Sequence, residues 1–377
     1  MWLSSHFRRL LFALPAGETS GQDATPAVRV GSSASLRMPA EWEAQCGVQL
    51  TWPHALTDWA PMLDEVTDCF VRIAREIAKR ERLVIVAPDV EEVKSRLGGE
   101  VNLHNVTLFS CPTDDTWARD HGPLTLKDDG GNVYLSDFKF NGWGGKYPAE
   151  KDDCITRRMC EAGILRGRRI DCSSFVLEGG SVESDGQGTL MTTSSCLLSA
   201  GRNDALSRDE IETRLKDLLH AERVLWIDHG KIVGDDTDGH VDTLARLCPC
   251  DTILYVSCSD PRDEQYKELK LMEEQLRSFR TPGGKPYRLL PLPMPRPVVH
   301  EGERLPATYA NYLVMNGAVL YPTYGQPEPD AEAGRVIARA YPEREVVGID
   351  CSPLIRQHGS LHCVTMQFPT GVLDDGS

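Results

Sequence analysis

Four short segments of the chain combine the residue types that nucleophilic and acid–base catalysis needs. They cover residues 116–123, 177–181, 235–242 and 358–367, and each lies where a strand is expected to begin or end. A thiol can attack an electrophilic carbon, a histidine can move protons, and carboxylates can hold a cation. We therefore expect catalysis where these segments meet.

The candidate nucleophile is Cys363, which stands in a segment rich in Gly, Ser and His before the strand-like run 364–366. A buried, inert thiol is the usual interpretation of a single cysteine. Because side chains alternate along a strand, His362 should point away from Cys363 and would be a poor base for it.

His240 and Asp242 form a second candidate pair. Gly239 permits a sharp entry, and residues 241–247 are expected to form a strand. In a strand, residues i and i+2 face the same side, so the imidazole and the carboxylate would point into one site. Taken alone, a surface His and Asp after a loop remains the simpler interpretation.

Trp117 and Asp120 suit a planar cation, since one offers a ring face and the other a carboxylate. Arg119 lies between them, and it could instead pair with Asp120 in a turn. The residues leave both alternatives open.

A repeated unit of hairpin, helix and strand must position these segments. Four such units are expected at a spacing of roughly 60 residues. Their hairpins turn at 128–131, 185–188, 248–251 and 316–317, and their helices cover 151–162, 208–220, 263–277 and 330–341. Ser207 and Glu210 have the spacing of a capping box at the start of the second helix. Units of this kind bury their sheets by packing around a common axis.

Composition excludes several partners. The formal net charge is −15, from 41 Lys and Arg against 56 Asp and Glu, which argues against nucleic acid and permits a small cationic substrate. Solubility alone also explains this charge. No apolar run approaches the ~18 residues of a membrane span. The twelve scattered cysteines indicate reduced thiols in a cytoplasmic compartment, and Cys248 and Cys250 lack the pattern of a zinc site.

Residues 1–37 differ from the rest, with a basic-apolar patch followed by a stretch rich in Ser, Ala and Gly. An organelle transit peptide, a disordered extension and a start codon upstream of Met38 are three competing explanations. We expect this segment to lie outside the fold and residues 38–377 to form one catalytic domain.

Taken together and in order, the four segments resemble the agmatine deiminase and bacterial peptidylarginine deiminase family. The resemblance rests on a Trp-x-Arg-Asp-x-Gly-Pro segment, a Glu-Gly-Gly segment, a Gly-His-Val-Asp segment and the C-terminal Cys, and it spans residues 38–369. It implies the α/β pentein fold, a five-bladed propeller of hairpin-helix-strand units with the active site on the central axis. One of five units would then have escaped the sequence pattern.

The resemblance also implies residue roles. Cys363 matches the nucleophile, His240 the general acid/base, and Asp120 and Asp242 the carboxylates that bind the guanidinium. Glu178 matches an acidic residue beside the histidine, and two further pocket residues are expected, Trp117 and Asp238. No metal or cofactor is required. The segment after Gly145 is shorter than in agmatine-specific members, which leaves the contacts of the substrate's far end open.

The expected reaction is hydrolysis of agmatine to N-carbamoylputrescine and ammonia through a covalent thiouronium on Cys363, a step toward putrescine. Peptidylarginine is the alternative substrate. Three other classes compete: another cysteine hydrolase, a metal-dependent hydrolase using His240, Asp242 and Asp238, and a non-catalytic propeller scaffold. The expected partner is a small cationic guanidino compound, and a homodimer is the expected assembly if the chain associates.

Overall fold

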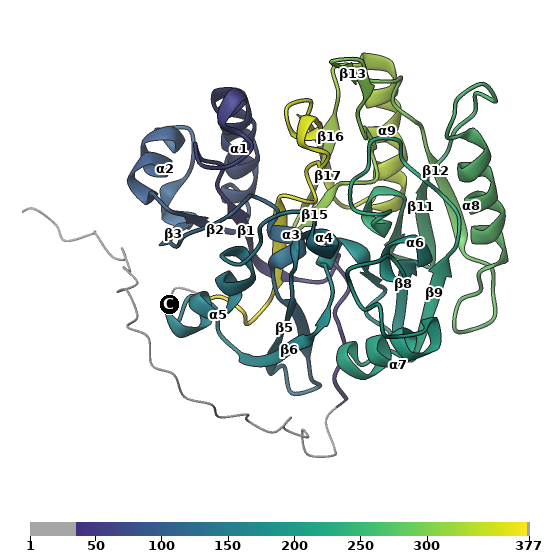
Figure 1. The fold of residues 1–377 in the computed structure, drawn as a ribbon, viewed down its shortest axis with the longest axis horizontal. Coiled ribbons are helices and arrows are strands. Elements are labelled where there is room, and N and C mark those ends of the chain that lie inside the picture. The colour runs from purple at the N-terminus through teal and green to yellow at the C-terminus, as the bar shows by residue number, and fades with distance from the viewer. Residues whose placement is uncertain (1–34, 375–377) are drawn as a thin grey trace, which may run out of the picture.

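The computed structural model describes residues 35–374, and five α/β sheets make up its framework (Figure 1). Each sheet contains an antiparallel strand pair, a following helical segment, and a strand that pairs in parallel with the second member of that pair. In Figure 1 the longer helices lie on the outside, while the short helices α3 (Ala118–His121) and α4 (Gly142–Gly145) lie toward the middle.

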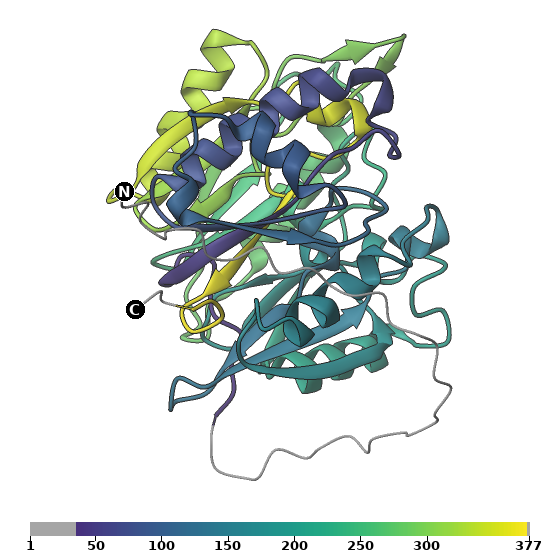
Figure 2. The same cartoon turned by 90° about the vertical axis from the view of Figure 1, so that its left-hand side faces the viewer.

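The first sheet joins the beginning of the domain to its end. Its strand order is β18-β1-β2-β3, with β18 antiparallel to β1 and the other pairs parallel. Figure 2 shows the purple β1 beside the yellow β18. The elements are β1 (Gln45–Thr51), α1 (Leu63–Ala78), β2 (Arg82–Ala87), α2 (Val90–Leu97), β3 (Val106–Ser110) and β18 (Thr365–Pro369).

The second and third sheets follow in chain order. The second contains β4 (Leu124–Lys127), β5 (Val133–Lys139), α5 (Ile155–Glu161) and β6 (Arg168–Val176). The third contains β7 (Glu183–Ser184), β8 (Thr189–Thr193), α6 (Ser194–Leu197), α7 (Arg208–Leu219) and β9 (Arg223–Ile227).

The fourth and fifth sheets complete the repeat. The fourth contains β10 (Ala245–Cys248), β11 (Thr252–Val256), α8 (Tyr266–Ser278) and β12 (Arg288–Leu292). The fifth contains β15 (Leu313–Met315), β16 (Ala318–Thr323), α9 (Pro327–Ala340) and β17 (Glu345–Asp350). A ribbon of β13 (Val299–His300) and β14 (Glu303–Arg304) lies between these two sheets in sequence.

Local sequence explains where the helices form and which faces they bury. The capping box of α7 is confirmed, since Ser207 and Glu210 bond each other's backbone N–H groups. In α1, Val66, Phe70, Ile73 and Ile77 recur every three or four residues, and all are fully buried. This spacing places them on one helix face, which packs against the first sheet.

The four expected units are confirmed, and a fifth comes from strands at the two ends of the domain. The five sheets are separate hydrogen-bonded units, and no closed sheet connects them within residues 35–374. Several element boundaries differ from those expected. The helices expected from 263 and 330 begin at Tyr266 and Pro327, and two elements differ in type. The expected helix 151–162 divides into a 3-10 turn at Asp152–Cys154 and α5. The expected strand 241–247 begins only at Ala245.

A 3-10 turn, η5 (Val241–Thr243), replaces the first part of that strand. The hydroxyl of Thr243 donates to the carbonyl of His240 at 2.8 Å, which closes the turn. Asp238 and Gly239 enter it with positive φ angles of 66° and 95°. The strand-like appearance of Val241 and Thr243 therefore gives way to local side chain–backbone hydrogen bonding.

Most of the expected extension 1–37 lies outside the described residues, but its last part belongs to the domain. Leu36 is 8% exposed and joins an apolar core shared by the first, second and third sheets. Arg37 pairs with the backbone of Lys127 and forms an ion pair with Glu43 at 2.5 Å. The domain therefore begins before Met38. Within residues 35–374 no helix is both long and apolar enough to cross a membrane.

Candidate active site

Three of the four segments supply lining residues of one cavity, although they belong to different parts of the sheet series. The fourth carries Glu178, which contacts His240 of the third segment. Asp120 lies in α3, Glu178 follows β6, Asp242 lies in η5, and Cys363 comes just before β18. The cavity holds about 470 Å³ of space out to the open solvent. Its lining residues are Asp58, Asp115, Trp117, Asp120, Trp143, Tyr147, Asp236, Thr237, Gln357, His358, Gly359 and Cys363.

Cys363 lies at the cavity wall and is only 4% exposed. Its Sγ is 3.3 Å from Oδ1 of Asn311, an oxygen that also accepts the backbone N–H groups of His362 and Cys363. Burial raises the pKa of the Cys363 thiol well above its usual value, and the nearby charges of Asp242 and Asp120 raise it further. Without a bound ligand, Cys363 is therefore a neutral thiol.

Gly180 marks the point on which the other site residues converge. It lies in the 3-10 turn η4 (Gly179–Ser181). A Cβ atom there would lie 2.6 Å from His240 Nδ1, 2.9 Å from Asp120 Oδ1 and 3.1 Å from Asp242 Oδ2. Only glycine allows the backbone to approach these three side chains so closely.

His240 is fully buried between two carboxylates. Its Nδ1 is 3.7 Å from Asp120 Oδ1 and its Nε2 is 3.9 Å from Glu178 Oε2, distances of ion pairs rather than hydrogen bonds. Burial lowers the pKa of His240, but the charge of Asp120, together with Cys196 and Glu178, outweighs it and raises the pKa well above the usual value. His240 is thus held as a cation that can donate a proton.

Glu178 is fully buried, and Arg202 balances its charge. Arg202 Nε donates to both carboxylate oxygens at 3.0 and 3.1 Å. Burial by itself raises the pKa of Glu178, but His240 and Arg202 lower it below the usual value. Glu178 therefore stays ionised beside the imidazole.

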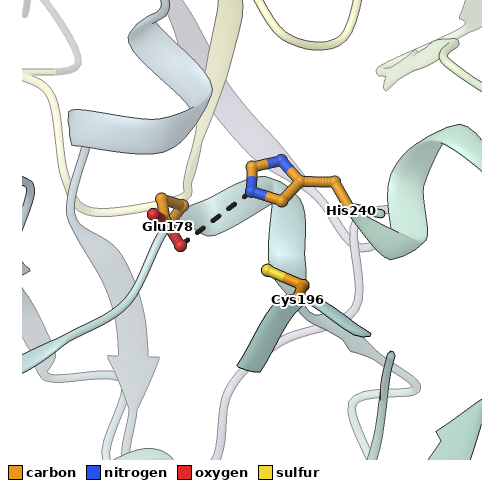
Figure 3. A group of neighbouring side chains, drawn as sticks. All are labelled: Glu178, Cys196 and His240. Atoms are coloured by element: carbon orange, nitrogen blue, oxygen red, sulfur yellow. Dashed lines mark ion pairs between the residues drawn. The ribbon is translucent and has the colours of Figure 1, made fainter. Parts of the chain in front are cut away.

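Figure 3 shows Cys196 and Glu178 pointing toward the His240 ring. Within residues 35–374, these three form the one group of His, Cys, Asp or Glu residues whose ligand atoms are close enough for a metal ion. Zinc takes such ligands. However, Arg202 already bonds both Glu178 oxygens, and the surrounding carboxylates keep His240 protonated. A metal ligand must be deprotonated, so these residues do not favour a resident ion.

Asp120 is oriented by two N–H donors, one for each oxygen. Its Oδ2 accepts from Trp143 Nε1 at 2.9 Å, and its Oδ1 accepts from the Gly180 backbone at 3.1 Å. Burial raises the pKa of Asp120 to about 6; the positive charge of His240 opposes this shift, and Asp242 adds to it. At neutral pH Asp120 is a carboxylate, as cation binding requires.

Asp242 is held by His362. His362 Nδ1 is 2.7 Å from Asp242 Oδ2, and its Nε2 is 2.8 Å from Oε1 of Glu41. Burial raises the pKa of Asp242, but the bond from His362 and the positive charges of His362, His240 and Arg246 together outweigh burial and lower it. Oδ1 of Asp242 is buried without a hydrogen-bond partner in the described part of the chain. His362 therefore orients the carboxylate and leaves one oxygen for a ligand.

The two weaker expectations differ in where they lie. Trp117 lines the cavity, and Gly359 packs against it so closely that a Cβ would be 2.0 Å from the indole ring. Asp238 is not among the lining residues. It forms ion pairs with Arg202 at 2.6 Å and with Lys146 at 3.0 Å.

The alternative pairing of Arg119 with Asp120 does not occur. Arg119 NH1 lies 3.3 Å from Glu41, and the same guanidinium donates to Gln367. Arg119 is absent from the cavity lining.

Several residues of the site were missed from the sequence: Asn311, Trp143, Arg202, Cys196 and Glu41. Asn311 and Glu41 reach the site from far away in the chain and belong to none of the four segments. The sequence could have indicated Trp143, because it lies in the glycine-rich run Gly142-Trp143-Gly144-Gly145, which matches no nucleotide-binding pattern.

Comparison with known proteins identifies a family that matches almost the whole described chain. The model of the Porphyromonas-type peptidyl-arginine deiminase family matches residues 37–369. Agmatine deiminase of Pseudomonas aeruginosa is 33% identical, over 89% of this chain and 95% of its own length.

Solved structures of deiminases have a similar fold. A candidate arginine deiminase from Porphyromonas gingivalis is 52% identical with a TM-score of 0.85, covering 90% of this chain and all of its own. A substrate-bound Cys-to-Ser variant of the C. jejuni agmatine deiminase is 32% identical with a TM-score of 0.83, over 92% of this chain and all of its own.

Proposed function

The chain belongs to the Porphyromonas-type peptidyl-arginine deiminase family, and from this premise we propose that it hydrolyses agmatine to N-carbamoylputrescine and ammonia. Its relatives are named agmatine deiminases, hydrolases that act on a C–N bond of a linear amidine. The chain is accordingly an enzyme of this hydrolytic family.

The observation that carries the choice of agmatine is the charge of the cavity. Four carboxylates line it, those of Asp58, Asp115, Asp120 and Asp236, and none of its described lining residues is Lys or Arg. Agmatine has a guanidinium at one end and an ammonium at the other. Free arginine would need a cation for its α-carboxylate, and Arg119 is engaged with Glu41 and Gln367.

Two carboxylates and a thiol could carry out the first half of the reaction. Asp120 and the open oxygen of Asp242 would take the guanidinium N–H groups and orient its carbon toward Cys363. The substrate's positive charge would favour ionisation of the thiol, whose proton leaves to solvent. The thiolate forms a C–S bond, His240 gives its proton to one nitrogen, and the C–N bond breaks to release ammonia.

Water completes the reaction. The covalent thiouronium on Cys363 has a carbon that water can attack, and the now neutral His240 accepts a proton from that water. The new C–O bond forms and the C–S bond breaks. The remaining proton of the new hydroxyl passes to the departing thiolate, so the ureido product leaves and Cys363 is a thiol again. His240 returns to its cationic form, and the net change is one water consumed and one ammonia released.

We also infer that the five sheets are the blades of a propeller of the pentein type. The fivefold recurrence of the same strand order and the lining of one cavity by three sheet-end segments support this arrangement. The active site would then lie on the axis.

Peptidylarginine is the second candidate substrate, because the family model carries that description and the cavity opens to solvent. The deciding experiment compares kcat/KM for agmatine with that for a blocked arginine peptide, with free arginine as a third substrate. A preference for agmatine is expected. Preference for the peptide, or no ammonia from agmatine, would refute the agmatine assignment.

A further inference from the structure

The loop that carries Trp143 has an unusual backbone. Gly142, Trp143, Gly144 and Gly145 all have positive φ angles, of 68°, 57°, 85° and 81°. Left-handed backbone is unfavourable for a bulky residue such as tryptophan. Such conformations persist where the surrounding structure over-determines them, and they cluster at functional sites.

Close packing holds this loop in place. Asn141 accepts from the Gly144 backbone at 2.9 Å and donates to the Gly201 carbonyl at 2.8 Å. A Cβ on Gly142 would lie 2.1 Å from the Tyr147 carbonyl oxygen, so glycine is required there. The strained conformation is therefore built in by neighbours on both sides.

The result is one specific contact inside the site. Trp143 is 8% exposed and lines the cavity, and its Nε1 donates to Asp120 Oδ2 at 2.9 Å. A tryptophan that only filled the wall could stand in a relaxed conformation and be replaced by any large ring. Here the backbone strain directs the indole N–H at a carboxylate of the proposed reaction.

We propose that Trp143 is a positioning residue, whose indole N–H holds the Asp120 carboxylate in the plane needed to bind a guanidinium. This inference rests on the proposed hydrolysis of a guanidino substrate. Together with the Gly180 N–H on the other oxygen, the indole fixes the rotation of the carboxylate about its Cβ–Cγ bond.

The bond from Trp143 to Asp120 should be detectable through the pKa of Asp120, which depends on the charged groups around it. The groups that act on its pKa or share the site with it are His240, Asp242, Glu178 and Cys363. Burial raises the pKa of Asp120 to about 6, and the Trp143 N–H is among the contacts that lower it. Removing that N–H should raise this pKa.

The sign of the pH effect follows. Only the carboxylate form of Asp120 binds the cation. The value of kcat/KM is therefore highest above the pKa of Asp120 and decreases as the pH falls below it. The profile of kcat/KM reports groups of the free enzyme. Trp143→Phe keeps a ring but removes the donor, so the acid limb should move to higher pH.

The test is ammonia release by the full chain between pH 5 and 9, for wild type and W143F. We expect W143F to lower kcat/KM by about 10- to 100-fold, the loss typical of a hydrogen bond to a charged group, and to shift the acid limb upward. The matched control is W226F, which removes the bond from Trp226 Nε1 to Glu212 on the outer helix α7. It should retain the wild-type profile.

A second variant covers the case in which W143F fails to fold. Benzothienylalanine at position 143 keeps the bicyclic ring and replaces only the N–H, and it should reproduce the kinetic defect with wild-type circular dichroism. A wild-type pH profile in either folded variant would overturn the positioning role. If the wild type releases no ammonia from any guanidino compound, the proposed function fails instead, so the two failures are distinguishable.

Discussion

Four buried polar atoms at the site lack a hydrogen-bond partner in residues 35–374: both ring nitrogens of His240, Oδ1 of Asp242 and Nδ2 of Asn311. An unsatisfied buried polar group costs about 1–3 kcal/mol, and native proteins keep few of them. A guanidinium would supply the N–H that Asp242 lacks, and its departing nitrogen would meet His240. The proposed chemistry therefore explains the open Asp242 oxygen and one ring nitrogen of His240.

The surroundings of Cys363 disfavour the thiolate, which is the reactive form of this side chain. Burial, Asp242 and Asp120 all raise its pKa. A bound cation would reverse this balance, so reactivity should depend on substrate. The structure thus adds to the hypothesis of nucleophilic attack by Cys363 that the thiolate forms only when the cation is bound.

We predict that Cys363→Ser folds like the wild type but loses turnover by at least about 1,000-fold, because a neutral hydroxyl is a far weaker nucleophile. Steady-state ammonia release and the melting temperature would be measured together. Cys250→Ser is the matched control, since Cys250 is exposed and does not line the cavity. Activity of C363S within about threefold of wild type would exclude this nucleophile.

At the scale of elements, three single-turn helices present the site residues. Asp120 lies in α3, Gly180 in η4 and Asp242 in η5. Strand periodicity led us to place His240 and Asp242 at the start of a strand, which was wrong. Their convergence was expected correctly, but it arises from a turn closed by the Thr243 hydroxyl.

The sequence predicts only those site residues that lie in the four recognisable segments. Cys363, His240, Asp120, Asp242 and Glu178 stand in recognisable segments, and the structure brings all five together. Asn311 could not be assigned, because its amide contacts Cys363 through the tertiary fold alone. Arg202 could not be assigned for the same reason, because its partners Glu178 and Asp238 lie in other segments of the chain.

We predict that Gly180→Ala reduces kcat/KM by about 100-fold or more, because its Cβ would meet His240 Nδ1 at 2.6 Å and displace it from reacting distance. Stability should fall by about 1–3 kcal/mol, as in other overpacked sites. Gly99→Ala is the control, since a Cβ there meets no atom within 4 Å. Wild-type kinetics in G180A would show that the turn has room to spare and does not set the geometry.

At the scale of the whole molecule, the ends of the domain build one of its five sheets. β18 pairs with β1 from Gln45↔Pro369 to Leu50↔Thr365, and Cys363 lies just before β18. No hairpin turn joins these strands, so the sequence pattern revealed only four units. The nucleophile is thus positioned by pairing between the first and last strands, which ties catalysis to completion of the fold.

The residues before β1 also pack onto the domain, and their contacts predict where the folded domain begins. Leu36 is buried and Arg37 pairs with Lys127, whereas none of the residues placed in the site precedes Glu41. A chain beginning at Ser35 should keep the wild-type melting temperature and kcat/KM. A chain beginning at Met38 should keep its activity but lose the burial of Leu36, roughly 1.5–3 kcal/mol.

The ion pair of Arg37 with Glu43 adds little to that difference, because both side chains are partly exposed, at 42% and 33%. The melting temperature of the Met38 chain should therefore fall by on the order of 2–6 °C relative to the Ser35 chain. Differential scanning calorimetry of the two truncations beside the full chain measures this directly. Equal melting temperatures would place the boundary at Met38, and loss of stability in the Ser35 chain would show that residues 1–34 also contribute to the folded domain.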